Sequence, residues 1–205
     1  MFKFDKRSGI ETGAKDVLVA KIQIENEDTF HLKNLYKLIH DWMDEEGFVD
    51  LYGERHPDGN PEIFYLERIG GTGSREHRIR WRYIKTPRDS PYYRYFVKID
   101  FLSINMKSIE VMHQGYKMKT DRGDLVIDVE GWLQLDYNNE WDKTPFLKNR
   151  FIQKLFSNRI YKEKIESHKV ELYKAIYRLQ NTIKQYLKLK TLYEMPKPFH
   201  PEKGL

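Results

Sequence analysis

Cysteine is absent from this chain of 205 residues. Its absence excludes disulfide bonds, thiol catalysis and zinc held by cysteine. No run of apolar residues approaches the ~18 that a membrane-spanning helix needs. The first residues, Met1–Arg7, lead into a polar stretch without the apolar segment of a secretory signal. Together these absences predict a soluble protein of the cytoplasm without a membrane span.

The motifs of common catalytic and metal sites are also missing. Gly70–Ser74 is rich in glycine, but a phosphate-binding loop needs Gly-Lys-Ser/Thr before a helix, and here Arg75 begins an expected strand. A hairpin loop is therefore the favoured interpretation. The seven histidines show none of the spacings of a zinc site, and no serine or threonine lies in a recognisable nucleophile motif. We predict no metal, no cofactor and no catalytic residue, with enzymatic activity as the less favoured alternative.

Two rows of charge on expected strands have a simple explanation. One row is acidic and the other basic, and each lies on one face of its strand. A buried pair of carboxylates could perform acid–base chemistry, but ion pairs between neighbouring strands suffice to explain both rows. The rows are Asp124, Asp128 and Glu130, and Arg78, Arg80 and Arg82.

What the chain has is aromatic residues, with 14 Tyr, 11 Phe and 4 Trp to build a core. At 17–25 apolar and polar residues alternate, which predicts a half-buried strand. Apolar residues at helical spacing predict a helix over 29–46, capped by Asp28 or Thr29 and ended by Gly47. The expected inner face of the strand carries Leu18, Ala20, Ile22 and Ile24.

Alternating segments between residues 48 and 137 predict further strands joined by short turns, hence an antiparallel meander. Within one of them the inward-facing parity changes across Gly115, which predicts a β-bulge there. Gly131 predicts a bend in the last strand. The expected strands are 49–55, 63–69, 78–85, 93–101, 109–118 and 125–135.

Thr144-Pro145 predicts the start of a C-terminal helix, and neither proline nor glycine occurs again before Pro196. Two apolar stripes follow, separated by Ser157-Asn158, so either one helix spans 145–192 or two helices join near residue 158. The whole pattern predicts an α+β fold. A curved antiparallel sheet of six or seven strands packs on a long C-terminal helix, with one shorter helix after the first strand.

Charge is distributed unevenly along the chain. Residues 1–143 hold 22 Lys/Arg and 26 Asp/Glu, whereas residues 144–193 hold 12 Lys/Arg and 3 Glu. We divide the chain into an N-terminal arm (1–16), an α+β domain (17–157), a basic amphipathic helical extension (158–193) and an extended tail (194–205). The extension is either a solvated helix face or a contact for an anionic partner. Candidate residues for such a contact are Lys154, Arg159, Lys162, Lys169, Arg178, Lys184 and Lys188.

The order of these elements resembles the helix-grip arrangement of START and SRPBCC-like proteins. The segments that carry the resemblance are Leu18–Glu25 leading into Phe30–Trp42, then Tyr93–Phe101, Ile109–Met118, Leu125–Tyr137 and the chain from Thr144 onward. The resemblance covers about 17–190 and involves no motif. It implies a curved sheet that wraps the last helix around an apolar cavity. Its candidate lining is Tyr95, Ile99, Val111, His113, Ile127, Leu133, Phe151 and Leu155.

Three functions fit these patterns, and each needs a different structure. We favour a non-catalytic binding or assembly protein that self-associates or binds a protein through the C-terminal helix, which requires an apolar stripe exposed on a single chain. A carrier or enzyme for a hydrophobic small molecule requires an apolar cavity of ~300–1,000 Å³. A nucleic-acid or ribosome-associated protein requires one continuous basic surface. The candidate partner contacts are Leu172, Ile176, Leu179, Ile183 and Leu187.

Overall fold

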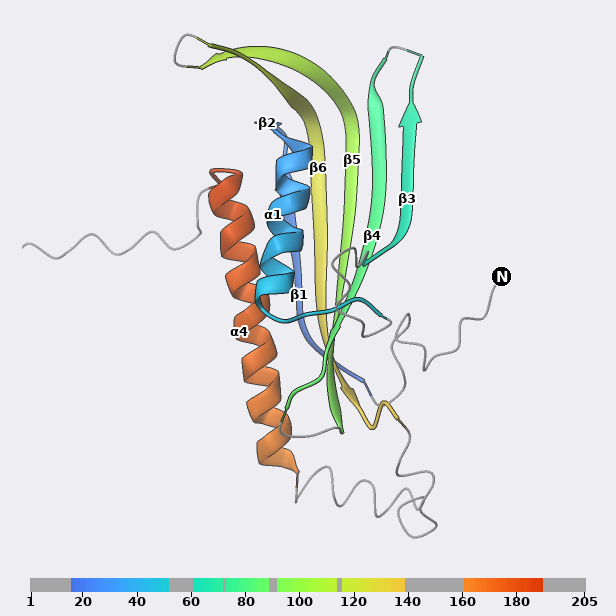
Figure 1. Cartoon of the computed structure of the whole chain (residues 1–205), viewed down its shortest axis with the longest axis vertical. Coiled ribbons are helices and arrows are strands. Elements are labelled where there is room, and N and C mark those ends of the chain that lie inside the picture. Colours follow the sequence, from blue (N-terminus) through green and yellow to red (C-terminus); the bar gives the residue numbers. More distant parts are fainter. Residues whose placement is uncertain are drawn as a thin grey trace, which may run out of the picture.

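The computed structural model describes residues 16–51, 61–71, 73–88, 92–113, 116–138 and 161–189. They form a six-stranded antiparallel sheet and two helices, which confirms the predicted α+β fold (Figure 1). The strands lie in the order β1-β6-β5-β4-β3, and β2 pairs with β6 beside this path. The elements are β1 (Val17–Asn26), β2 (Thr29–Phe30), α1 (Leu32–Glu45), β3 (Glu62–Ile69), β4 (Arg75–Lys85), β5 (Tyr93–His113), β6 (Tyr116–Leu135) and α4 (Lys162–Tyr186).

Strand β1 forms because its apolar residues alternate with charged and amide side chains. Ala20, Ile22 and Ile24 are buried, as predicted. Leu18 was expected on the same face but is 44% exposed. The pairing of β1 with β6 shifts register between Leu18 and Ala20, and this irregularity breaks the alternation at its first member.

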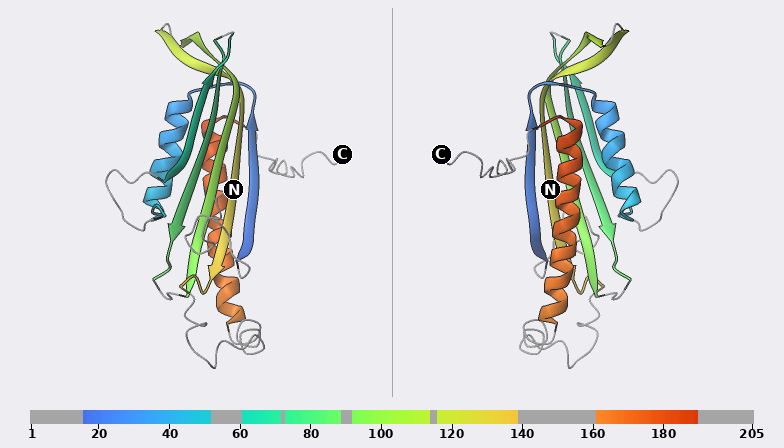
Figure 2. Two further views of the ribbon diagram at one scale, coloured as in Figure 1. Left: turned by 90° about the vertical axis from the view of Figure 1, so that its right-hand side faces the viewer. Right: turned by 90° about the vertical axis from the view of Figure 1, so that its left-hand side faces the viewer.

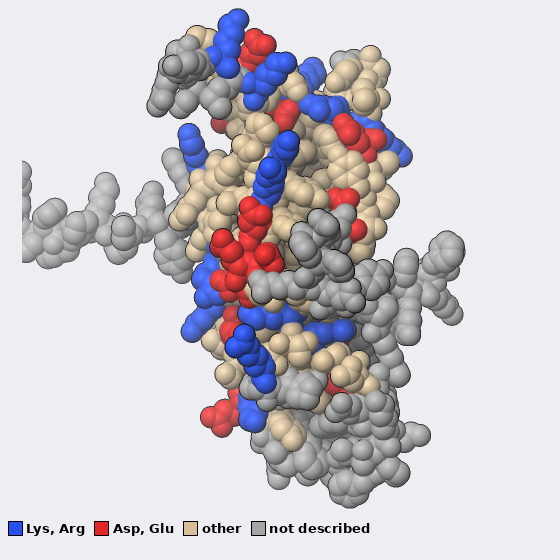
Figure 3. All heavy atoms as spheres, viewed as in Figure 1, with Lys and Arg blue, Asp and Glu red and all other residues tan. Residues whose placement is uncertain are grey.

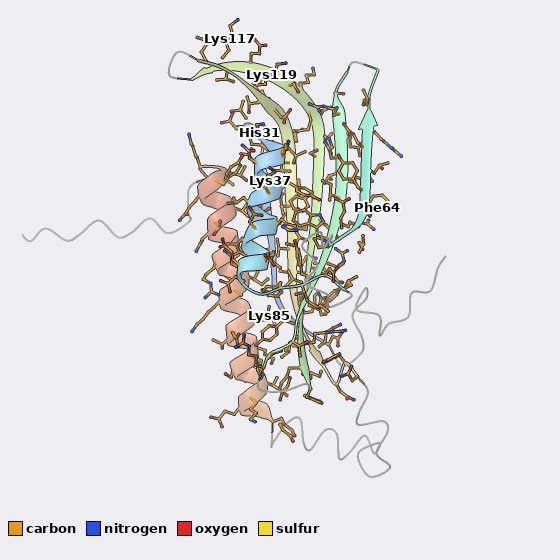
Figure 4. All side chains as sticks on the ribbon, in the orientation of Figure 1. His31, Lys37, Phe64, Lys85, Lys117 and Lys119 are labelled. Carbon is orange, nitrogen blue, oxygen red and sulfur yellow. The ribbon has the colours of Figure 1, made fainter. Side chains whose placement is uncertain are left out.

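Helix α1 starts later than the sequence pattern predicts. The predicted caps, Asp28 and Thr29, precede it, and Thr29 belongs to β2. The N-cap is His31, whose Nδ1 accepts a hydrogen bond from the Asn34 backbone N–H at 3.4 Å. The predicted end is confirmed, because Gly47 adopts a φ of 78°, which favours glycine. Lys85 of β4 reaches this end and donates to the Glu46 carbonyl at 2.8 Å (Figure 4).

The first predicted pair of strands is confirmed only in part. β3 and β4 form an antiparallel hairpin, and the Gly70 N–H donates to the Ser74 carbonyl across its turn. Gly70–Ser74 is therefore a hairpin connection, as expected. Of the strand predicted at 49–55, Val49 makes an isolated bridge to Ile84. Residues 52–60 lie outside the described residues.

The longest strands correct the prediction of a bulge at Gly115. The segment predicted at 93–101 and the first part of the segment predicted at 109–118 belong to one strand, β5. The rest of the second segment begins β6, and the two strands pair as far as His113 opposite Tyr116. The parity changes there because the two sides belong to different strands; Gly115 itself lies outside the described residues. The register irregularity falls instead between Ile104 and Lys107, next to Asn105 with a φ of 56°. The outer ends of β5 and β6 bend over toward β2 and α1 (Figure 1).

Both helices cover one face of the sheet and enclose a single apolar core (Figure 2). The two helices run in opposite directions. Arg178 in the middle of α4 contacts Glu46, just after the end of α1. Tyr186 at the end of α4 donates a hydrogen bond to the His31 carbonyl, just before the start of α1, at 3.1 Å. The predicted helix start at Thr144 and the joint near residue 158 lie outside the described residues. Neither described helix is long and apolar enough to cross a membrane.

Candidate functional site

The core between sheet and helices contains half of the predicted cavity lining. Tyr95, Ile99, Ile127 and Leu133 are each at most 1% exposed. Val111 is 38% exposed near the outer end of β5, so it does not join them. Phe151 and Leu155, and the side chain of His113, are outside what the structure describes. A ligand cavity therefore stays a prediction.

Helix α4 lies in close contact with the sheet at Gly131 of β6. A Cβ atom at this position would stand 2.9 Å from Ile176 Cγ1 and 3.6 Å from Leu172 Cγ. The glycine thus serves a close helix–strand contact in addition to the bend predicted for it. Direct packing at this level leaves no space for a ligand between β6 and α4.

The apolar stripe of α4 that we expected to meet a partner faces the chain's own sheet. Leu172, Ile176, Leu179 and Ile183 are at most 1% exposed, and Leu187 is half-buried. The assembly hypothesis required this stripe to be exposed on a single chain, and the sheet covers it instead. Any contact surface on α4 must therefore lie outside this buried stripe.

One flank of α4, beside the buried stripe, carries a second, weaker stripe, which we call the outer seam. Its middle holds three exposed apolar or aromatic side chains, Val170, Tyr173 and Tyr177, which are 50%, 44% and 38% exposed. The two tyrosine rings lie against each other with centroids 4.3 Å apart. Steps of three and four place all its members on one side of a helix. The outer seam consists of Glu163, Glu166, Val170, Tyr173, Tyr177, Gln180, Lys184 and Leu187, of which Leu187 is half-buried against the core.

Charges along α4 are partly neutralised within the chain. Lys169 Nζ lies 2.7 Å from Glu166 Oε1, and the Arg178 guanidinium holds both carboxylate oxygens of Glu46 at 2.9 and 2.8 Å. Of the other anionic-partner candidates, Lys154 and Arg159 lie outside the described residues. Lys162, Lys184 and Lys188 form no ion pair with any residue that the structure describes. Figure 3 shows acidic groups interrupting the basic ones on this face, so the basic surface is not continuous there.

A cluster of three side chains on β3, β4 and β5, of which His77 and Ser103 are buried and Glu67 is exposed, has the components of a nucleophilic triad. Ser103 Oγ lies 2.9 Å from His77 Nδ1, and His77 Nε2 lies 3.5 Å from Glu67 Oε1. Ser103, however, is only 1% exposed and also accepts the His77 backbone N–H at 3.2 Å. A substrate cannot reach this hydroxyl, so the chain of bonds ties three strands together. Sequence analysis missed it because His77 and Ser103 meet only through the β4–β5 register.

A second buried network joins α4 to the sheet. The Tyr95 hydroxyl lies 2.8 Å from His168 Nδ1 and donates to Glu171 Oε2 at 2.9 Å. The His168 ring also packs on the Tyr93 ring, with centroids 4.4 Å apart. His168 is 5% exposed and interrupts the apolar inner stripe of α4, which is the one sequence signal that could have indicated it. The network fixes the position of α4 along β5.

An aromatic and acidic cluster lies where α1 meets β3. The Tyr36 hydroxyl donates to Glu62 Oε2 at 3.1 Å, and the Tyr36 ring meets the Trp81 ring edge-on at 4.4 Å. Burial and the Glu62 carboxylate raise the pKa of Tyr36 to about 12. The cluster holds the edge strand against α1. No group of three or more metal-ligating side chains occurs among the described residues.

Comparison with known proteins adds no relative. No model of a known protein family matches the sequence, and no curated protein sequence is significantly similar to it. The function must therefore be inferred from the chain's own surfaces.

Proposed function

We propose that this chain is a non-catalytic binding or assembly protein whose contact surface is the outer seam of α4. The observation that carries the proposal is the exposed centre of the seam, formed by Val170, Tyr173 and Tyr177. Tyrosine presents a large rigid surface and loses little conformational freedom on binding. Exposed tyrosines grouped with an aliphatic residue on one helix side are typical of a contact surface.

The charges that flank this centre define the chemistry of the partner. Glu163 and Glu166 lie at one end of the seam, and Lys184 lies at the other, with Lys188 beside it. A protein surface with an apolar centre, acidic at one end and basic at the other, satisfies both ends.

The test uses a fluorescent helical peptide with lysines at one end, tyrosine and valine in the centre and glutamates at the other. Fluorescence anisotropy measures its binding to the protein. Because interface aromatics contribute about 1–3 kcal/mol each, Tyr173→Ser combined with Tyr177→Ser is expected to weaken binding by at least about tenfold. Ile69→Ser on β3 is the matched control, since Ile69 is an exposed apolar side chain (73%) far from the seam.

Two results would contradict the proposal. One is equal binding of the peptide by the wild type and the double tyrosine variant. The other is tight binding of a labelled single-stranded oligonucleotide, lost at high salt, which would favour the nucleic-acid function instead. Action in the cytoplasm stays a prediction from the composition.

Carriage of a hydrophobic small molecule is the second proposal. The curved antiparallel sheet packed against a C-terminal helix is compatible with the helix-grip topology that suggested it (Figure 1). Mass spectrometry of an organic extract of the purified protein tests it. One equivalent of a co-purified apolar compound would support carriage. An empty extract together with no binding of a fluorescent fatty acid would exclude that ligand class.

A further inference from the structure

We propose that the partner of the outer seam is a second copy of this chain, packed through α4 in the antiparallel direction. The inference rests on the proposed function, because it uses the same surface. Its basis is the polarity of the seam, which is acidic at Glu163 and Glu166, apolar in the centre and basic at Lys184. A two-fold axis across the middle of α4 reverses one helix, so each acidic end meets a basic end.

The spacing of the seam supports the same arrangement. Its steps of three and four form two heptad positions, and in antiparallel helix pairs the residues of one position face those of the other. A two-fold axis beside Ala175 brings all of them into register at once. The resulting layers join Glu163 to Leu187, Val170 to Gln180, Tyr177 to Tyr173 and Lys184 to Glu166, each residue facing its partner on the second copy.

The opposite orientation is disfavoured by charge. A parallel pair would place Glu166 against Glu166 and Lys184 against Lys184 of the second copy, and like charges in contact repel. The tyrosines are compatible with the antiparallel pair. Tyr173 and Tyr177 already lie against each other on one helix, and the axis would bring four such rings into one central cluster.

Within the described part of the chain the seam is exposed at its centre, whereas Gln180, Lys184 and Leu187 are half-buried and Leu187 packs against the core. The centre stays 38–50% exposed although the inner stripe of α4 is buried. The right-hand view of Figure 2 shows α4 in front of the sheet. The Arg178–Glu46 pair ties α4 to the end of α1, and Tyr95, His168 and Glu171 tie it to β5. The surface offered to a second copy is therefore held rigid.

Charge reversal tests the register. Light scattering and sedimentation over a range of protein concentrations give the dimer dissociation constant. Glu166→Lys and Lys184→Glu each place like charges together twice in the antiparallel dimer, and each is expected to raise the constant by about tenfold. The double variant restores both pairs and is expected to return to within about threefold of the wild type. Lys164→Glu, an exposed lysine outside the seam, is the matched control.

The rescue is specific because Glu166 also pairs with Lys169 on its own helix. That pair is lost in both the single Glu166→Lys variant and the double variant, so its loss cannot explain a difference between them. Circular dichroism of all variants confirms that α4 is retained. Failure of the double variant to recover would overturn the proposed register.

Disulfide trapping gives an independent test, since the chain has no native cysteine. Val170→Cys and Gln180→Cys are made as separate proteins of different size and mixed under mild oxidation. The antiparallel register predicts a disulfide between the two variants and none within either. Crosslinking of Val170→Cys to itself would indicate a parallel pair and overturn the proposal.

The peptide experiment separates this inference from the proposed function. A wild-type chain that stays monomeric at high concentration but binds the peptide through Tyr173 and Tyr177 would exclude the second copy and leave the proposed function standing. A monomer that binds no peptide would exclude both.

Discussion

Glu130 and Asp128 lie two positions apart on one face of β6, yet their pKa values are shifted in opposite directions. Burial acts to raise the pKa of Glu130, but hydrogen bonds from Lys21 and Trp132 outweigh it, and the pKa falls below the ordinary value. For Asp128, burial reinforced by neighbouring carboxylates raises the pKa and outweighs the opposing effect of the Lys21 ammonium. Ionised Glu130 therefore stabilises the fold, and ionised Asp128 destabilises it.

Asp128→Asn is expected to raise the free energy of unfolding at pH 7. The ionised form of Asp128 is disfavoured in the folded chain, and the substitution removes that charge. The gain is present above the folded-state pKa. It disappears as the pH falls below the ordinary value of 3.8, where the carboxyl is protonated in both states. Urea denaturation at pH 7 and pH 3 measures it.

Glu130→Gln is the comparison, with the opposite sign. The stabilisation that ionised Glu130 gives the wild type is present above the ordinary pKa of 4.5 and is lost as the pH falls through the lowered folded-state pKa. The variant is therefore expected to be less stable than the wild type at pH 7 and to approach it at pH 3. Equal stability of both variants and the wild type at pH 7 would contradict the assigned shifts.

At the scale of elements, Gly131 shows what a sequence pattern can and cannot indicate. Its place in an alternating strand predicts a bend, since glycine interrupts the row of side chains. Its contact with Ile176 depends on where α4 crosses the sheet, about 45 residues later in the chain. Local patterns carry no information about such a crossing.

Gly131→Ala is expected to lower the free energy of unfolding by about 1–3 kcal/mol, since the new methyl group would stand 2.9 Å from Ile176 Cγ1. Either α4 moves away from β6 or the isoleucine leaves its preferred rotamer. Gly71→Ala is the control, because a Cβ there would meet nothing within 4 Å. Denaturant unfolding of both variants makes the comparison, and a Gly131→Ala midpoint equal to the control would show that the two elements are not in tight contact.

The strands and α1 were predictable because their apolar residues repeat at the periods of strand and helix. The errors fall where tertiary pairing overrides the local pattern. Leu18 alternates correctly but lies before a register shift. Asp28 and Thr29 are residue types that favour helix caps, yet Thr29 belongs to β2 and pairs with Arg122 of β6, and His31 caps the helix instead. At Gly115 the change of parity marks the step from β5 to β6, which alternation alone cannot distinguish from a bulge.

At the scale of the whole molecule, the sequence pattern indicated the helix of the proposed contact surface but not the side of that helix. The pattern favoured the more apolar stripe, with Leu172 and Ile176, as the partner contact. Folding takes that stripe for the core, because burying aliphatic side chains against the sheet gains more free energy than exposing them to a later partner. The less apolar seam with Tyr173 and Tyr177 is left exposed, and only the position of the sheet reveals it.

Salt is expected to weaken self-association without abolishing it. The antiparallel pair has an apolar centre around Tyr173 and Tyr177, which salt does not screen, and exposed Glu–Lys pairs at both ends, which contribute about 0.2–1 kcal/mol each. Raising the salt concentration from about 50 mM to about 500 mM, where the Debye length falls well below ~10 Å, should increase the dimer dissociation constant severalfold while a dimer persists at high protein concentration. Light scattering with absorbance at 260 and 280 nm measures this.

A mass that collapses to the monomer in high salt, with excess 260 nm absorbance lost at the same point, would mean that a bound polyanion had held the molecules together. In that case Lys184 and Lys188 would be phosphate contacts, and the seam would not be a protein interface.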